Sequence, residues 1–177
     1  MNSQILQFVI LIAPLLLAVT LHEVAHGYAA LQFGDPTAKN AGRLTLNPIA
    51  HLDPFGSVIL PALLVFSGSP AIFGYARPVP VNFANLGNGR TGTIAVSVAG
   101  VATNLACAAA SGLVYRMVYP LGAHSDAAVV ILMIQLLYVF CVINVVLAVF
   151  NLIPIPPLDG SRILSAILPQ EARRTYD

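Results

Sequence analysis

The sequence predicts an all-α membrane protein, a polytopic bundle of transmembrane helices joined by short re-entrant or β-like loop elements. Of its 177 residues, 58% are apolar and only 8% are charged, whereas soluble domains carry about a quarter charged residues. Four intervals contain no Asp, Glu, Lys or Arg: Met1–His22, Pro54–Ala76, Thr91–Tyr115 and Ala127–Leu158. At least three of them reach the length of about 20 residues that a membrane-crossing helix needs.

The same composition excludes other classes of protein. The net charge is +1 and there is no basic tract, so nothing indicates nucleic acid as a partner. Cys107 and Cys141 lie inside apolar runs, where cysteine behaves as a small hydrophobe, and we expect no disulfide between them. The first segment lacks the basic start of a signal peptide. We therefore expect one domain over residues 1–177, in contact with membrane lipid.

Three long helices are expected. The first starts near Ile5 and continues to about Phe33, where Gly34-Asp35-Pro36 ends it. The second covers Thr91–Tyr119 and is rich in small residues. The third covers Asp126–Phe150, the longest apolar stretch, and prolines interrupt the chain after it.

The chain between the first two helices is expected to be irregular. Within the polar loop Lys39–Asp53, the residues Arg43–Leu46 alternate like a short strand. The segment Ser57–Phe73 begins with only ten apolar residues before Gly and Pro interrupt it, so we expect it to enter the membrane without crossing. Prolines keep Ala76–Phe83 extended.

Small residues recur every four positions in the second helix, at Gly100, Asn104, Ala108 and Gly112. Such a face lets another helix pack closely. Asn104 is polar at membrane depth, and the sequence leaves two interpretations for it: a hydrogen bond between helices, or the lining of a cavity.

The first long apolar run ends in the motif His22-Glu23-x-x-His26. Positions i and i+4 share a helix face, so both imidazoles can reach one metal ion. Glu23 lies about 100° further round the helix, where it can contact a water on the metal. This arrangement is typical of a catalytic zinc site, in which the carboxylate accepts the proton of the water.

A chance match is the alternative interpretation, because the pattern fixes only three positions. Ionisable groups inside a membrane helix cost several kcal/mol unless they are paired or coordinated. Three of them in five residues of so apolar a chain favour metal binding.

A catalytic zinc site needs a third protein ligand. The candidates are His51, Asp53, His124, Asp126 and Asp159. His124 and Asp126 lie in what reads as a solvated turn. Asp159 follows the longest charge-free stretch, and its alternative role is to cap a short helix over Ser161–Leu168. Its place after a long apolar run favours metal ligation.

These residues resemble the site-2 proteases, which are intramembrane zinc metalloproteases. That family carries H-E-x-x-H on one transmembrane helix and an L-D-G motif near another, here Leu158-Asp159-Gly160. Its asparagine eight residues before the aspartate corresponds to Asn151. The blocks Gly42–Gly56 and Ala76–Asn82 look like the short, minimal branch without a PDZ domain.

The chain departs from the family in two respects. The metal motif lies in the first helix, without the preceding helix of longer relatives. The chain also ends at Asp177, where relatives usually continue into another apolar segment, as expected of either a shortened chain or a compact variant.

The resemblance implies an endopeptidase with one zinc per chain, held by His22, His26 and Asp159. It implies a multi-pass protein of a prokaryotic cell (inner) membrane, with a site open to the cytosol, that acts on single-span transmembrane proteins. Glu23 would be the proton acceptor. Asn151, and less securely Asn104, would hydrogen-bond the oxyanion or the substrate backbone.

A transmembrane substrate must unwind before its peptide bonds are accessible. The two extended pieces of the loop are expected to pair with the unwound strand, although packing of the loop explains them equally well. The residues expected to contact substrate are Arg43, Leu44, Thr45, Leu46, Val79 and Val81.

The metal site also constrains topology. Asp159 reaches the depth of His22 only if Ser57–Phe73 does not count as a full crossing. Two other functions remain: a metal-binding membrane protein or transporter, and a non-catalytic relative that binds transmembrane partners. Transport favours ionisable residues along a whole path, and a non-catalytic relative has no need of Glu23.

Overall fold

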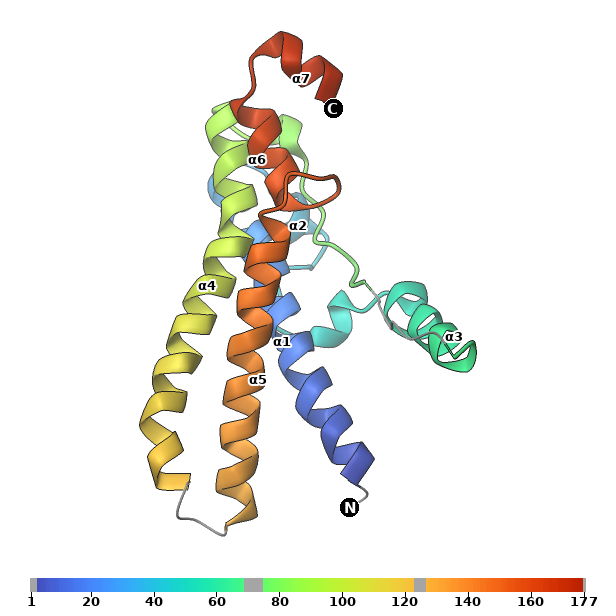
Figure 1. Cartoon of the computed structure of the whole chain (residues 1–177). Coiled ribbons are helices and arrows are strands. Elements are labelled where there is room, and N and C mark those ends of the chain that lie inside the picture. The colour runs from blue at the N-terminus through green and yellow to red at the C-terminus, as the bar shows by residue number, and fades with distance from the viewer. Residues whose placement is uncertain (1–2, 69–74, 123–126, 177) are drawn as a thin grey trace.

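The computed structural model describes residues 3–68, 75–122 and 127–176. Three long helices form a bundle, as Figure 1 shows: α1 (Ser3–Gln32), α4 (Gly89–Gly122) and α5 (Ala128–Asn151). Two short helices follow, α6 (Asp159–Ile167) and α7 (Gln170–Tyr176). The described residues contain no strand, so the predicted all-α class is confirmed. The predicted helices differ from the observed ones only by a few residues at their ends.

Each long helix is long and apolar enough to cross a membrane, over Val9–Gln32, Gly89–Pro120 and Ala128–Asn151. Only 6% of the apolar window of α5 is buried within the protein. So much exposed apolar surface is unfavourable in water but not in the hydrocarbon interior of a membrane. The chain is therefore a multi-pass membrane protein.

The second of these helices, α4, packs against α1, α5 and α6. Its small residues permit close approach, as predicted. Ala108 is buried and its carbonyl accepts a hydrogen bond from Cys141 Sγ on α5 at 3.3 Å. Gly112, one turn further along, also faces Cys141.

The chain leaves α1 and enters α4 at the same end of the bundle. Gly34 adopts a φ of +98° at the end of α1, a conformation that suits glycine. The carbonyl of Phe33 then accepts a hydrogen bond from the amide of Gly87 at 2.8 Å. The intervening residues therefore depart from one end of the bundle and return to it.

This intervening chain is largely irregular. It contains α2 (Thr37–Asn40), the 3-10 turns η1 (Pro48–His51) and η3 (Phe83–Asn85), the π-helical η2 (Pro54–Ile59) and α3 (Leu60–Phe66). The predicted strand at residues 43–46 does not form: the amide of Arg43 donates to the carbonyl of Ala38 in α2, and the carbonyl of Thr45 accepts from His51. Figure 1 shows α3 projecting from the bundle. At seven residues, α3 is too short to cross a membrane, and residues 69–74 lie outside the described part.

Asp35 ties this region to the end of α1. Its carboxylate is fully buried and accepts hydrogen bonds from the amide of Asn82 (2.7 Å), the side-chain amide of Asn85 (3.0 Å) and the amide and hydroxyl of Thr37. Burial alone would raise the pKa of Asp35, but the hydrogen bonds from Thr37, Asn85 and Asn82 outweigh it and hold the pKa below its ordinary value. Asp35 therefore fixes the segment that leads into α4.

We expect Asp35→Asn to lower the free energy of unfolding by about 1–3 kcal/mol, because one buried donor then faces an amide instead of a carboxylate oxygen. Since the folded-state pKa is depressed, the stabilisation is complete above the ordinary value. It is lost as pH falls through the folded-state pKa. Unfolding of the detergent-solubilised protein at several pH values measures it. In a double-mutant cycle, Asn85→Ala should cost less in the Asp35→Asn background, and additive losses would contradict the network.

Candidate metal centre and active site

One face of α1 presents both histidines of the motif to the interior. His22 and His26 are 6% and 8% exposed, and their Nε2 atoms lie 2.9 Å apart. Gly100 on α4 makes this possible, because a Cβ atom at that position would stand 2.5 Å from His26 Nε2. The small-residue face of α4 therefore accommodates the imidazoles as well as a neighbouring helix.

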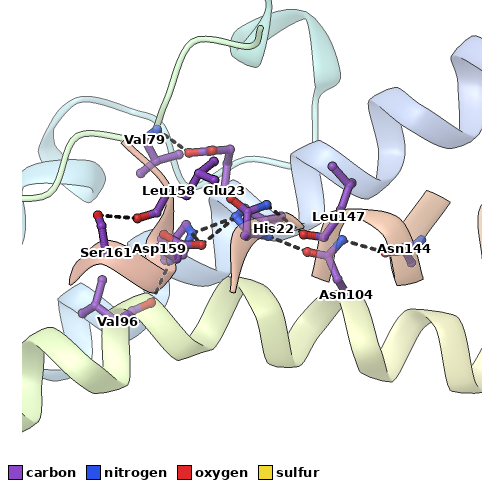
Figure 2. A network of polar contacts seen from close by, with 12 residues as sticks. His22, Glu23, Val79, Val96, Asn104, Asn144, Leu147, Leu158, Asp159 and Ser161 are labelled. Atoms are coloured by element: carbon purple, nitrogen blue, oxygen red, sulfur yellow. Dashed lines mark hydrogen bonds and ion pairs between the residues drawn. The ribbon is translucent and has the colours of Figure 1, made fainter. Parts of the chain in front are cut away.

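The start of α6 brings Asp159 to the two imidazoles. Its Oδ2 atom lies 3.2 Å from Nε2 of His22 and 3.2 Å from Nε2 of His26. The carbonyl of Leu158 accepts hydrogen bonds from the amide and hydroxyl of Ser161, which fix the first turn (Figure 2). A side chain on Gly160 would collide with the carbonyl of Leu152 at the end of α5. The glycine of the L-D-G motif thus lets the aspartate approach.

Hydrogen bonding fixes the proton on the ring of His26. Its Nδ1 lies 2.7 Å from the carbonyl of Val96 on α4. A carbonyl can only accept, so Nδ1 of the neutral ring carries the hydrogen and Nε2 presents its lone pair to Asp159.

A longer chain of bonds fixes His22 in the same way. The amide nitrogen of Asn144 on α5 donates to the carbonyl of Phe140 at 2.8 Å. Its oxygen must therefore face Asn104, whose nitrogen donates to it at 2.8 Å. The oxygen of Asn104 accepts from Nδ1 of His22, as Figure 2 shows. The backbone carbonyl of Phe140 thus determines that Nε2 of His22 also presents a lone pair.

Two imidazole lone pairs and a carboxylate oxygen consequently converge with no hydrogen between them. Asp159 Oδ2 is buried and receives no hydrogen bond from the described residues. Lone pairs at such separations repel unless a cation lies among them. The three atoms, all within 4.8 Å of one another, therefore fit a metal ion, and two imidazoles with one carboxylate form a donor set typical of catalytic zinc.

Glu23 lies beside this cluster and is not one of its three members. Its Oε2 atom accepts a hydrogen bond from the backbone amide of Val79 at 2.7 Å. Figure 2 shows the carboxylate directed to the extended segment that carries Val79, away from Asn104. The glutamate is therefore held next to the metal position without ligating it.

A cavity of about 250 Å³ adjoins the cluster. Its walls come from α1, α4, α6, the end of α5 and residues 78–83. They include His22, Glu23 and His26 of the H-E-x-x-H motif and Asp159 of the L-D-G motif. Val79, Val81, Asn151 and Arg162 also line the cavity. The cavity gives a substrate carbonyl and a water access to the metal position.

Only some of the residues predicted to contact substrate line this cavity. Val79 and Val81 line the cavity, but residues 43–46 do not. Arg43 instead lies behind the wall and donates to the carbonyl of Arg77 at 2.7 Å. That Arg43, Leu44, Thr45 and Leu46 contact substrate stays a prediction, and in this structure Arg43 holds the cavity wall.

The two predicted asparagines also differ. Asn104 does not line the cavity, and both ends of its amide are used by His22 and Asn144. It positions the ring of His22 in this structure, and its predicted role as an oxyanion donor stays a prediction. Asn151 does line the cavity, while its nitrogen donates to the carbonyl of Leu147 in its own helix at 3.0 Å.

Other candidates for the third ligand lie elsewhere. His51 is buried and its Nε2 donates to the carbonyl of Thr45. Asp53 accepts from the amides of Phe55 and Gly56 at the start of η2. Asp159 is the first residue of α6 and makes no capping bond there, which removes its alternative role. His124 and Asp126 lie outside the described residues.

Two parts of the site were not predicted from the sequence. Asn144 was overlooked, although an asparagine within the most apolar helix could have been recognised as a residue that needs a polar partner, since unpaired polar groups are unfavourable in lipid. In the structure it is fully buried. The amide of Val79 was also missed. Every residue except proline has a backbone amide, so no sequence pattern could have identified the amide of Val79 as the one that binds Glu23.

Asn144→Leu should weaken zinc binding about 10–100-fold, as expected when a residue that orients a ligand is lost. Without the oxygen of Asn144, Asn104 is free to rotate and no longer fixes the proton of His22. Competition with a chelator measures the affinity. Gln135→Leu removes an exposed amide from the same helix and should leave zinc binding unchanged. Unaltered affinity in a folded Asn144→Leu variant would contradict the relay.

Comparison with known proteins agrees with this geometry. The family model for peptidase family M50 matches residues 10–177. The "Putative zinc metalloprotease YwhC" of Bacillus subtilis (strain 168) is 41% identical over 163 residues, which cover 92% of this chain and 71% of that protein.

Mycobacterial relatives are more distant. The "Putative zinc metalloprotease Rip2" of Mycolicibacterium smegmatis is 33% identical, and that of Mycobacterium tuberculosis (strain H37Rv) is 34% identical. Each match covers 94% of this chain but only 60% of the relative. No solved structure matches the chain. The resemblance to site-2 proteases is confirmed, and the chain belongs to peptidase family M50.

Proposed function

We propose that the chain is an intramembrane zinc endopeptidase that hydrolyses peptide bonds within or near the transmembrane segments of single-span membrane proteins. One observation carries this proposal. His22, Glu23 and His26 lie inside the membrane span Val9–Gln32 and line a cavity together with Asp159. A hydrolytic site at that depth is suited to a substrate that is itself embedded in the membrane.

His22, His26 and Asp159 would hold the metal and leave a fourth position for water or substrate. Zinc supplies Lewis acidity there, which polarises the scissile carbonyl and makes a water more acidic. Gly100 keeps the space beside the imidazoles free of other side chains. The residues of the chain therefore provide both the ligand set and its access.

Glu23 is placed to move the proton. The amide of Val79 engages its Oε2 atom and orients the carboxylate toward the cavity wall. We assign Glu23 as the general base that takes a proton from the attacking water and afterwards passes it to the leaving amine. Because its carboxylate is outside the ligand set, it stays available for both transfers.

The wall at residues 78–83 is the proposed binding site for the unwound substrate. Val79 and Val81 line the cavity, and alternate residues of an extended segment face the same side. A transmembrane helix conceals its own carbonyls, so it must unwind before hydrolysis. An extended wall offers such a strand an edge with which it can form backbone hydrogen bonds.

Two other functions are less well supported. A transporter requires ionisable residues along a path through the membrane, but the metal-binding candidates of the described helices gather at one level. A non-catalytic partner-binding protein has no use for a glutamate fixed beside the metal position. Hydrolysis accounts for both features.

Glu23→Gln should keep about one zinc per chain and lose cleavage of a single-span substrate by about 10²–10⁴-fold, the usual contribution of a general base. His22→Ala should lose the metal as well as the activity. Metal analysis and cleavage by the protein in detergent or vesicles distinguish the two variants. Cleavage at the wild-type rate by Glu23→Gln would refute its assigned role.

Asn151→Ala separates a substrate-binding role from a helix-capping role. If the amide holds the oxyanion or the substrate backbone, turnover should fall about 10²–10³-fold, with zinc content and thermal midpoint nearly unchanged. If the bond to Leu147 is its main role, the variant should lose about 1 kcal/mol of stability and cleave almost normally. We expect the first outcome, because Asn151 lines the cavity.

A further inference from the structure

A second cavity, of about 210 Å³, lies on the other side of the wall that bounds the active site. Its lining includes two arginines, Arg43 and Arg77, with Ala41, Pro78 and Pro80; we call it the arginine pocket. No residue of the proposed catalytic mechanism lines it, so it requires an explanation of its own.

The guanidinium of Arg43 is only partly satisfied. The residue is 8% exposed, and one of its terminal nitrogens donates to the carbonyls of Arg77 (2.7 Å) and Pro78 (3.4 Å). Its Nε is buried and has no acceptor among the described residues. A buried charged donor without an acceptor is unfavourable, so this nitrogen indicates a missing oxygen ligand.

The charge of the pocket is not balanced either. Among the described residues, no carboxylate forms an ion pair with Arg43 or Arg77. The ion pairs of Asp159 are with the metal-site histidines. Glu23 acts on Arg43 only through space, and its Oε2 is engaged by Val79. Burial, and then the nearby charge of Arg77, lower the pKa of Arg43. Two adjacent cations in a hollow favour an anion, and guanidinium groups match phosphate oxygens well.

The surroundings of the pocket indicate where such an anion comes from. The span of α1 ends at Gln32, and Leu44, the neighbour of Arg43, packs beside Gly27 near that end, so the pocket lies close to the end of the membrane span. The same loop exposes Leu46 (61%) and Ile49 (72%). It is fastened to the pocket, because the carbonyl of His51 accepts from the amide of Arg77 at 2.9 Å. Exposed apolar side chains on the loop that lines a basic hollow suit a molecule with an acyl and an anionic part.

We propose that the arginine pocket binds the phosphate group of an anionic phospholipid. The headgroup phosphate would accept from the guanidinium groups of Arg43 and Arg77, while its acyl chains lie along Leu46 and Ile49. Basic pockets beside membrane helices bind lipid headgroups in this manner. A free phosphate ion would satisfy the arginines but would leave the exposed apolar side chains without a partner.

The test measures binding of defined lipids to the full chain in a non-ionic detergent, by native mass spectrometry and thermal midpoint. Phosphatidylglycerol should bind saturably and raise the midpoint. Phosphatidylcholine, whose choline offsets the phosphate charge, should bind more weakly. Arg77→Gln should weaken binding of phosphatidylglycerol about fivefold, the value of one basic residue near an anionic lipid at about 1 kcal/mol. The readout is binding, so it does not depend on the proposed protease activity.

Arg90→Gln is the matched control, because it removes an exposed arginine at the start of α4 that does not line the pocket; it should bind like the wild type. Arg43→Lys keeps the charge but lacks Nε, and a folded variant should also lose affinity. Equal binding of the two lipids, or equal binding by wild type and Arg77→Gln, would overturn the proposal. If inorganic phosphate alone raised the midpoint as much as phosphatidylglycerol, the lipid source would be wrong.

Discussion

Three lone pairs that face one another without a proton are the constraint on which the rest of the structure depends. Each imidazole must keep its hydrogen on Nδ1, so each needs an acceptor behind it. Val96 provides the acceptor for His26 and Asn104 provides it for His22. Both come from α4. The register of α4 against α1 is consequently fixed by chemistry as well as by packing, and Gly100 meets the imidazoles because of that register.

The extended wall at residues 78–83 connects features that are separate in the sequence. One face borders the metal cavity and the other borders the arginine pocket. The peptide unit between Pro78 and Val79 joins them directly, since its carbonyl accepts from Arg43 and its amide donates to Glu23. Arg162 on α6 lies over the ring of Phe83 at 4.4 Å and steadies the far end. The contacts of Arg43 and of Glu23 with the wall therefore meet at a single peptide unit.

Much of the fold could be predicted from the sequence, because apolar length alone identifies the three spans. The pair of histidines and Glu23 could be recognised as well, since helical spacing and the cost of burying charge in lipid point to the same residues. Asp159 was selected among five candidates by its position and the family resemblance. The contacts of Arg43 with the cavity wall could not be predicted, because its partners lie 34 and 35 residues further along the chain. The sequence left two roles open for Asn104. The hydrogen bond from its side-chain nitrogen to Asn144 orients its amide, and that bond depends on a tertiary contact that the sequence does not reveal.

The relay from Phe140 to His22 crosses all three membrane helices, since Asn144 is on α5, Asn104 on α4 and His22 on α1. A helix that is synthesised later thus supplies the group that orients the first. In a chain in which α5 has not yet docked, no acceptor chain fixes the proton of the His22 ring on Nδ1. The orientation of the first ligand on α1 therefore depends on the docking of α5 against α4.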